Sequence, residues 1–321
     1  AGLTAADLGS DIGGSIRIPA AFCGVFGHKP SATALPRSGH FPRGNLPNPA
    51  QLLAVQGPIA RGARDLELLL DTAAGPDGLE GKGWRLELPP ARFDELSGCR
   101  VGVLTLPEWI PVEDSIMAAL QQLMQVLREN GAAVTEADLS THFADFSAYY
   151  RKYLILMQCI VCGGLPAETR ARAAEKMRAY RDPFRDAIAD GLEAGAGMLL
   201  EMTEATESYK QRWEAIFQNF DVLLSPVCSV NAFTHDDSYF YDRVLDVSGT
   251  KMPYYRLSAL PAIASMAGLP ATAFPTGQLD ENNAPIGLQV MGAYLEDRST
   301  LCFAQLVEQT LGGFKAPPGF D

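Results

Sequence analysis

The chain has 321 residues, 47% of them hydrophobic, and a formal net charge of −12. This length allows one large core or two smaller ones, and an acidic chain without a basic run disfavours binding to nucleic-acid phosphates. The longest apolar stretch, residues 153–165, is too short for a membrane span and is interrupted by Gln158, so we expect no membrane span and a cytoplasmic location.

The first feature along the chain is a glycine pair, Gly13 and Gly14, directly before Ser15. Glycine leaves its backbone N–H uncovered and adopts positive φ freely, so the N–H groups of residues 12–15 could turn toward one point beside the Ser15 hydroxyl. Acyl transfer requires this arrangement, because the amide donors stabilise the oxyanion that forms when a nucleophile attacks a carbonyl. The same pattern also occurs in ordinary turns, and the spacing by itself leaves both interpretations open.

The longer run around this serine is more specific. Residues 9–17 read Gly-Ser-Asp-Ile-Gly-Gly-Ser-Ile-Arg, and residues 19–31 read Pro-Ala-Ala-Phe-Cys-Gly-Val-Phe-Gly-His-Lys-Pro-Ser. The run resembles the second half of the signature of the amidase signature family. Members of that family hydrolyse carboxylic amides or, as glutamyl-tRNA amidotransferase A subunits, transfer ammonia. His28 and Ser31 differ from the residue types usual in the family, and neither stands at the position of the nucleophile.

The resemblance implies a catalytic role for the loop before the first predicted helix. Ser15 would be the nucleophile that forms the acyl-enzyme. The oxyanion hole would be formed by the backbone N–H groups of Ile12, Gly13, Gly14 and Ser15.

Three neighbouring residues would have supporting roles by the same resemblance. Ser10 would support the hydrogen-bond network of the nucleophile, and Asp11 and Arg17 would fix the loop, with a plain ion pair as the simplest interpretation. Cys23 is expected to be a small buried side chain, as free cysteine often is.

The family uses a Ser-Ser-Lys triad, and the resemblance places the lysine and the bridging serine before Ala1. We therefore expect residues 1–321 to be one amidase signature domain that is incomplete at its N-terminus and that needs the N-terminal segment for its active site. Lys29 is the lysine nearest to Ser15 in the sequence, and the resemblance assigns it to the scaffold. A Ser-His-Asp triad stays an alternative in principle, but no Gly-x-Ser-x-Gly elbow occurs in the sequence.

The six cysteines show no disulfide-like spacing. Cys159 and Cys162 lie in an apolar helical run, which favours two core side chains over a redox or metal motif. No His, Cys and carboxylate group has the spacing of metal ligands. We expect neither a metal nor another cofactor.

The rest of the chain alternates predicted helices and strands. Helices are expected over residues 63–74, from Asp114 to Gly131, over most of 143–220, and over 257–267 and 298–311. Strands are expected over 100–104, 132–137, 221–227, 272–275 and 285–292, and loops over 36–49 and 75–98. This order indicates an α/β fold in which helices cover both faces of a mixed sheet, which is also the fold that the resemblance implies.

Substrate preference is less well determined by the sequence. Phe143, Phe146, Tyr149 and Tyr150 form an aromatic group that is typical of a core, with a pocket wall as the alternative. Residues 232–236 resemble a loop of small-amide and aryl-amide hydrolases in the family, and this similarity is weak.

Three functions are consistent with the sequence. The first is hydrolysis of a small-molecule amide through an acyl-enzyme, for which residues 1–321 alone are expected to be inactive because the lysine base is missing. A homo-oligomer is compatible with this function. The second is an amidotransferase A subunit with a partner protein, although residues 140–220 lack the Arg/Gly/Tyr-rich block associated with such subunits. The third is a non-catalytic remnant that acts as a partner-binding module.

Overall fold

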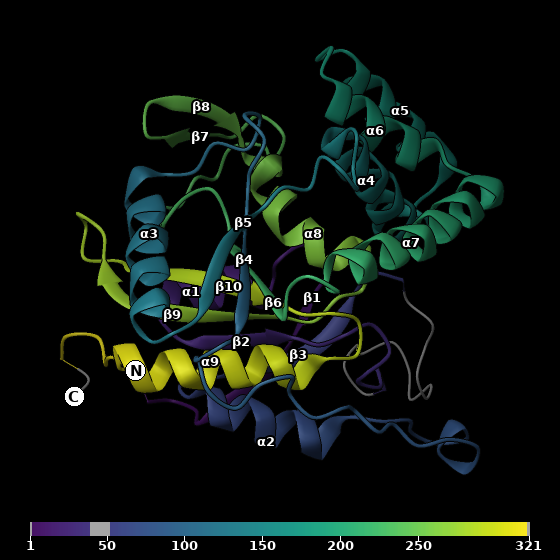
Figure 1. Ribbon diagram of the computed structural model, residues 1–321. Coiled ribbons are helices and arrows are strands. Elements are labelled where there is room, and N and C mark those ends of the chain that lie inside the picture. Colours follow the sequence, from purple (N-terminus) through teal and green to yellow (C-terminus); the bar gives the residue numbers. More distant parts are fainter. Residues whose placement is uncertain (1, 39–51, 320–321) are drawn as a thin grey trace.

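The computed structural model describes residues 2–38 and 52–319, and its centre is a mixed β-sheet of eight strands (Figure 1). Across the sheet the strands follow the order β1, β3, β2, β9, β10, β6, β4, β5. Their bounds are β1 Ala6–Asp11, β2 Phe26–Lys29, β3 Val55–Ala60, β4 Arg100–Leu104, β5 Ala133–Ala137, β6 Val222–Pro226, β9 Ala271–Leu279 and β10 Pro285–Met291.

Strand direction divides the sheet into two parts. The strands from β1 to β6 in the spatial order pair antiparallel, and β6, β4 and β5 pair parallel. The strands β4 and β5, joined by the helix α3 Asp114–Glu129, form the parallel edge, as parallel neighbours require a crossover connection. A separate hairpin, β7 Val244–Val247 with β8 Thr250–Pro253, stands apart from the sheet.

Helices cover both faces of the sheet, as the sequence predicts. Along β6, Val222 and Leu224 join one core cluster and Leu223 joins the other, because successive side chains of a strand point to opposite faces. The first face carries α2 Ala63–Ala73, α3 Asp114–Glu129 and α9 Asp297–Leu311.

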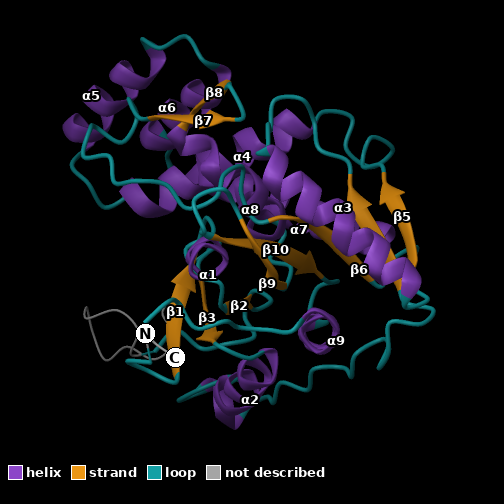
Figure 2. Ribbon diagram, turned by 90° about the vertical axis from the view of Figure 1, so that its left-hand side faces the viewer, coloured by secondary structure: helices purple, strands orange, loops and turns teal. Residues whose placement is uncertain are grey.

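The second face carries the short helices α1 and α8 and a block of longer helices (Figures 1 and 2). Here lie α1 Arg17–Cys23, α4 Phe146–Cys162, α5 Ala167–Arg178, α6 Pro183–Glu193, α7 Ala196–Ile216 and α8 Ala259–Met266, with the 3-10 turn η2 Tyr254–Ser258 before α8. Another 3-10 turn, η1 Glu80–Lys82, lies in the linker that follows α2. Asp145 caps α4 and Asp182 caps α6, each by accepting backbone N–H groups of the first turn.

Most predicted elements lie where the periodicity places them. The strand at 100–104, the helix from Asp114 and the mainly helical segment 143–220 are confirmed. The predicted loop at 36–49 lies mostly outside the described residues. The expected helix at 257–267 is divided between η2 and α8.

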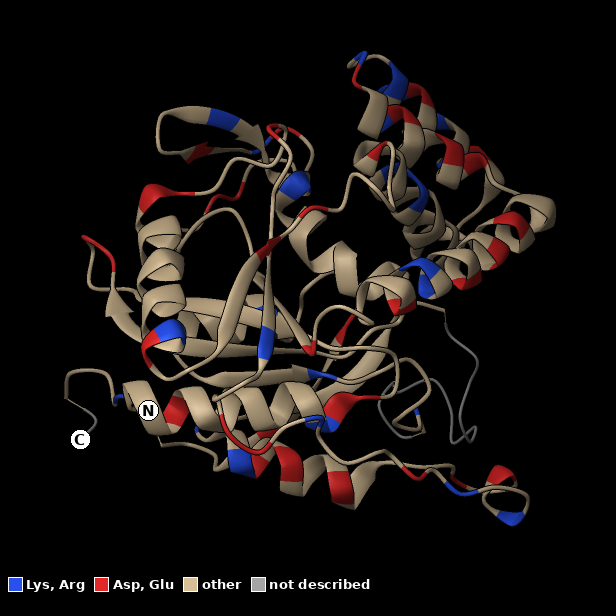
Figure 3. Cartoon of the chain, in the orientation of Figure 1, with Lys and Arg blue, Asp and Glu red and all other residues tan. Residues whose placement is uncertain are grey.

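Lys and Arg positions are scattered over the described helices and loops and are mixed with Asp and Glu (Figure 3). Within the described residues, no helix combines the length and apolar character that a bilayer crossing requires.

Candidate functional site

The loop between β1 and α1 carries the candidate nucleophile. The strand ends at Asp11, the helix begins at Arg17, and Ser15 between them is exposed. Gly14 has a φ of 106°, and a Cβ at this position would lie 2.7 Å from Ile18 Cδ1. Glycine is therefore required here both for its backbone conformation and for its lack of a side chain.

A buried carboxylate organises this loop. Asp11 accepts hydrogen bonds from the backbone N–H groups of Gly14 at 2.7 Å, Ile16 at 3.3 Å and Arg17 at 3.4 Å. It also bonds the Arg17 guanidinium at 3.0 and 3.1 Å, with both side chains fully buried. Burial by itself raises the pKa of Asp11, yet Arg17 and the N–H donors bring it below its ordinary value.

Arg17 connects the loop to the centre of the molecule. Its guanidinium donates to Gln289 Oε1 on β10 at 3.0 Å, and to the Pro261 carbonyl at 3.1 Å and Ser265 Oγ at 3.0 Å on α8. The ion pair therefore holds the loop against one strand and one helix that lie far away in the sequence.

The backbone donors of the loop fall into two sets. Gly14 N–H is occupied by Asp11 Oδ1, which differs from the expectation that it joins the oxyanion hole. The N–H groups of Ile12, Gly13 and Ser15 have no acceptor among the residues that the structure describes. These three donors are the ones available to a bound group.

Tyr153 on α4 holds the first peptide of the loop. Its hydroxyl donates to the Ile12 carbonyl at 3.1 Å and lies 2.6 Å from the position that a Cβ of Gly13 would take. In a trans peptide the C=O and the following N–H point in opposite directions. The bond to Ile12 therefore turns Gly13 N–H away from Tyr153.

A cavity of about 470 Å³ opens beside Ser15. This volume lies within the usual range for small-molecule sites, roughly 300–1,000 Å³. The described residues that line it come from the loop, α1, α4, α6, residues 240–241 and the η2 region: Ile12, Gly13, Gly14, Ser15, Ile18, Pro19, Leu154, Met157, Gln158, Ile188, Phe240, Tyr241, Tyr254, Tyr255, Leu257 and Ser258.

Two of the neighbouring residues lie elsewhere than expected. Ser10 pairs with Gln56 in the β1–β3 ladder. Its hydroxyl has no hydrogen bond to another described residue, so no observed contact supports the expected role of Ser10 beside the nucleophile. Cys23 is exposed at the end of α1, so the prediction of a buried side chain is wrong. In the last turn of this short helix, Ala20 and Ala21 are the buried side chains, and Cys23 faces solvent.

Lys29 is fully buried on β2, and its ammonium donates to the Pro30 carbonyl at 2.9 Å. It is absent from the described lining of the Ser15 cavity. Burial, then repulsion from Arg17, lowers its pKa to about 7, while Asp11 and Asp297 act in the opposite direction. Its position in the interior agrees with a scaffold role.

The predicted aromatic group belongs to the core rather than to this cavity. Phe143, Tyr149 and Tyr150 are buried, and Tyr149 Oη donates to the Ile263 carbonyl and accepts from Trp213 Nε1. The cavity is instead lined by other residues of α4, including Gln158. The sequence holds one signal for this residue, namely a glutamine inside an apolar helical run.

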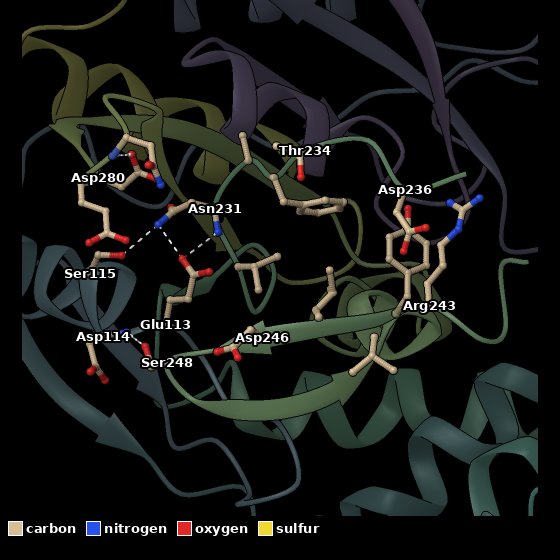
Figure 4. Close-up of a pocket in the computed structure, with 18 residues that line it drawn as sticks. Glu113, Asp114, Ser115, Asn231, Thr234, Asp236, Arg243, Asp246, Ser248 and Asp280 are labelled. Carbon is tan, nitrogen blue, oxygen red and sulfur yellow. Dashed lines mark hydrogen bonds between the residues drawn. The ribbon is translucent and has the colours of Figure 1, made fainter. Parts of the chain in front are cut away.

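A larger cavity of about 990 Å³ lies under the β7–β8 hairpin (Figure 4). Its polar lining is dominated by carboxylates, and Glu113 is bound by the backbone N–H and side-chain amide of Asn231 at 3.0 and 2.8 Å. The glycine-rich loop does not contribute to its described lining. The Ser15 cavity is therefore the candidate site.

Comparison with known proteins gives a family match and curated relatives. A family model described as Amidase matches residues 1–301. The chain is 30% identical to the A subunit of the glutamyl-tRNA(Gln) amidotransferase of Thermus thermophilus, with 97% of this chain and 66% of that protein covered. It is 28% identical to the corresponding protein of Halothermothrix orenii, with 95% and 64% covered. The chain thus spans slightly less than two thirds of the length of these curated relatives.

Solved structures show the same fold. A bacterial aryl acylamidase described as belonging to the amidase signature family superposes with a TM-score of 0.69 at 20% identity, over 96% of this chain and 63% of that chain. A protein from a vestigial complex related to an s-triazine catabolic enzyme superposes with a TM-score of 0.70 at 24% identity, over the same shares.

Proposed function

The chain belongs to the amidase family, and from this membership we propose that it takes part in hydrolysis of a carboxylic amide with Ser15 as the nucleophile. The observation that carries the proposal is the position of Ser15, exposed at a cavity beside three backbone N–H groups without acceptors among the described residues.

The proposed reaction has two steps. Ser15 Oγ bonds to the amide carbon, its proton passes to a base, and the carbonyl oxygen becomes an oxyanion that accepts from the N–H groups of Ile12, Gly13 and Ser15. The C–N bond then breaks, and ammonia or an amine leaves with a proton. Water attacks the resulting ester, releases the carboxylic acid and returns the proton to Ser15.

The base in this scheme is the lysine that the family resemblance implies. The described lining of the cavity contains no lysine, histidine or carboxylate. The Ser-Ser-Lys triad, a small-molecule substrate and a cytoplasmic location all stay predictions.

The test is reaction of the full-length protein with a fluorophosphonate probe, followed by peptide mapping, together with ammonia release from simple amides. We expect Ser15→Ala to abolish both, since removing a catalytic nucleophile leaves at most the contributions of binding and the oxyanion hole. Ser97→Ala, at an exposed serine outside the cavity, is the matched control. Labelling of another serine in the Ser15→Ala protein would contradict the assignment.

A second candidate function is favoured by the curated relatives, which are amidotransferase A subunits. It predicts release of ammonia from glutamine and co-purification with a partner protein. A protein that purifies alone and leaves glutamine intact while it hydrolyses another amide would exclude this candidate.

A further inference from the structure

A buried glutamine on β10 contacts the ion pair that holds the Ser15 loop. The side chain of Gln289 is fully buried, and its Oε1 accepts from Arg17 Nη1 at 3.0 Å. Its Nε2 donates to the Pro226 carbonyl at 3.0 Å and to Ser225 Oγ at 3.3 Å, both on β6. One amide therefore joins the loop to two neighbouring strands of the sheet.

The partners of this amide fix its orientation. An arginine side chain can only donate hydrogen bonds, and a main-chain carbonyl can only accept them. The amide oxygen of Gln289 must therefore face Arg17, and its nitrogen must face Pro226. Neither a hydrocarbon side chain nor an ionised glutamate offers an acceptor and a donor together, so glutamine fits this position by its chemistry and not by its size alone.

Gln289 determines how the Arg17 guanidinium meets the Asp11 carboxylate. Arg17 Nε and Nη2 face Asp11 at 3.0 and 3.1 Å, and Nη1 at the remaining corner faces Gln289. Within the described part of the chain, Nη1 has no acceptor other than Gln289. Because the guanidinium is planar and rigid, a partner at one corner sets the direction of the other two.

The Asp11 carboxylate in turn holds the backbone on both sides of the nucleophile. Its Oδ1 accepts from Gly14 N–H and from Arg17 Nη2, and its Oδ2 accepts from Ile16 N–H and from Arg17 Nε. Gly14 and Ile16 are the residues directly before and after Ser15. A rotation of the carboxylate would therefore turn both flanking peptides, and with them the free N–H groups of the loop.

We propose that Gln289 is a positioning residue for Ser15 and for the oxyanion donors beside it, acting through Arg17 and Asp11. This role rests on the proposed function, because it concerns the same serine. Gln289 does not belong to the described lining of the cavity, so we expect it to affect the acylation step more than substrate binding.

The first experiment measures the loop without turnover. Amide hydrogen exchange of Gly14 and Ile16 is followed in the full-length protein by mass spectrometry with residue-level fragmentation. Gln289→Met keeps a side chain of similar length and removes both polar contacts, and we expect exchange at the two amides to become at least about tenfold faster. Should Gln289→Met fail to fold, Gln289→Glu is measured instead. When ionised it lacks the donor for the Pro226 carbonyl, and the same direction of change is expected.

Thr276→Val is the matched control. Thr276 on β9 is also buried, and its hydroxyl donates to the Ile286 carbonyl on β10 at 2.8 Å. The variant removes a buried hydrogen bond of the same sheet that does not involve the loop, so exchange at Gly14 and Ile16 should stay within about twofold of the original protein. Equally fast exchange in the Thr276 and Gln289 variants would overturn the proposal, because it would reflect a general loss of stability.

The second experiment measures acylation. In Gln289→Met we expect kcat on the best amide and the rate constant of fluorophosphonate labelling at Ser15 to fall at least about tenfold, while KM changes by less than about threefold. The amplitude of labelling counts the folded molecules, and its rate constant describes the site within them. A smaller folded fraction would therefore lower the amplitude alone.

The outcomes separate this role from the function on which it rests. Unchanged exchange of Gly14 and Ile16 in a folded Gln289 variant would overturn the positioning role, and so would faster exchange with an unchanged rate constant of labelling. Absence of labelling at Ser15 in the original protein would overturn the proposed function and, with it, the positioning role.

Discussion

At Asp11, one carboxylate decides which backbone donors of the loop are free. It accepts from the N–H groups of Gly14, Ile16 and Arg17, and the Arg17 guanidinium neutralises it. Donors that are already bonded cannot stabilise a bound oxyanion. The loop geometry therefore leaves the N–H groups of Ile12, Gly13 and Ser15 for that role.

The hydrogen bond from the Tyr153 hydroxyl to the Ile12 carbonyl leads to a prediction for a single residue. We expect Tyr153→Phe to lower kcat about tenfold with little change in KM, since a misplaced oxyanion donor weakens transition-state binding more than substrate binding. Steady-state kinetics of the full-length protein on its best amide measures kcat and KM separately and tests this expectation.

Tyr149→Phe is the matched control for Tyr153→Phe. Both tyrosines lie on α4, both are fully buried, and both hydroxyls donate to a backbone carbonyl. Each substitution should lower the free energy of unfolding by about 1–3 kcal/mol, because the Ile12 or Ile263 carbonyl loses its donor and, in Tyr149→Phe, the Trp213 N–H also loses its acceptor. A fall of kcat in both variants, or in neither, would contradict a positioning role for Tyr153.

At the scale of elements, the contact between α4 and α6 forms a wall of the cavity. Gly191 on α6 permits this contact, because a Cβ there would lie 2.5 Å from the Ile155 carbonyl oxygen and 2.8 Å from Gln158 Cβ. The backbone of α4 and Gln158 would both have to move to admit a side chain. The position of Gln158 thus depends on a glycine in another helix.

Gly191→Ala is expected to lower the free energy of unfolding by roughly 1–3 kcal/mol through this overlap. Gly197→Ala on α7, where nothing lies within 4 Å of the added Cβ, should be neutral or stabilising by up to about 1 kcal/mol. Urea denaturation of both variants tests the contrast. Equal effects of the two substitutions would contradict the close approach of α4 and α6.

At the scale of the whole molecule, Lys29 makes global stability depend on pH. Its pKa in the folded chain is about 7, below the ordinary value of 10.5, and burial is the main cause. Between these pH values the unfolded chain holds a proton that the folded chain has released. The free energy of unfolding therefore rises with pH across this window, and the full cost of burying the charge is present below pH 7.

Lys29→Met should remove this rise. We expect the slope of the unfolding free energy between pH 7 and pH 9 to be lower in the variant by up to about 1.4 kcal/mol per pH unit, which corresponds to one proton. Chemical denaturation over that range measures the slope, and Lys82→Met on the surface controls for loss of a lysine. Identical slopes in the original protein and Lys29→Met would contradict the prediction.

Strand prediction succeeded in the parallel part of the sheet and failed near the loop. Residues 101–104 and 222–224 are continuous apolar runs and are buried, as strands covered on both faces require. The sequence analysis predicts no strand for β1, β2 or β3. Their glycines and proline weaken local strand propensity, and the pairing with β9 and with one another stabilises them instead.

The α/β pattern, the helices with an apolar face and the Gly-Gly-Ser loop can be predicted from the sequence, because each depends on residue type and on short-range spacing. The groups that surround this loop are set by the tertiary packing. Tyr153 meets Ile12 across 141 residues of chain, and Gln158 reaches the same cavity through the packing of α4. The occupation of Gly14 N–H by Asp11 likewise depends on atomic geometry. Contacts of this kind follow from how the helices pack on the sheet, which no local pattern in the sequence specifies.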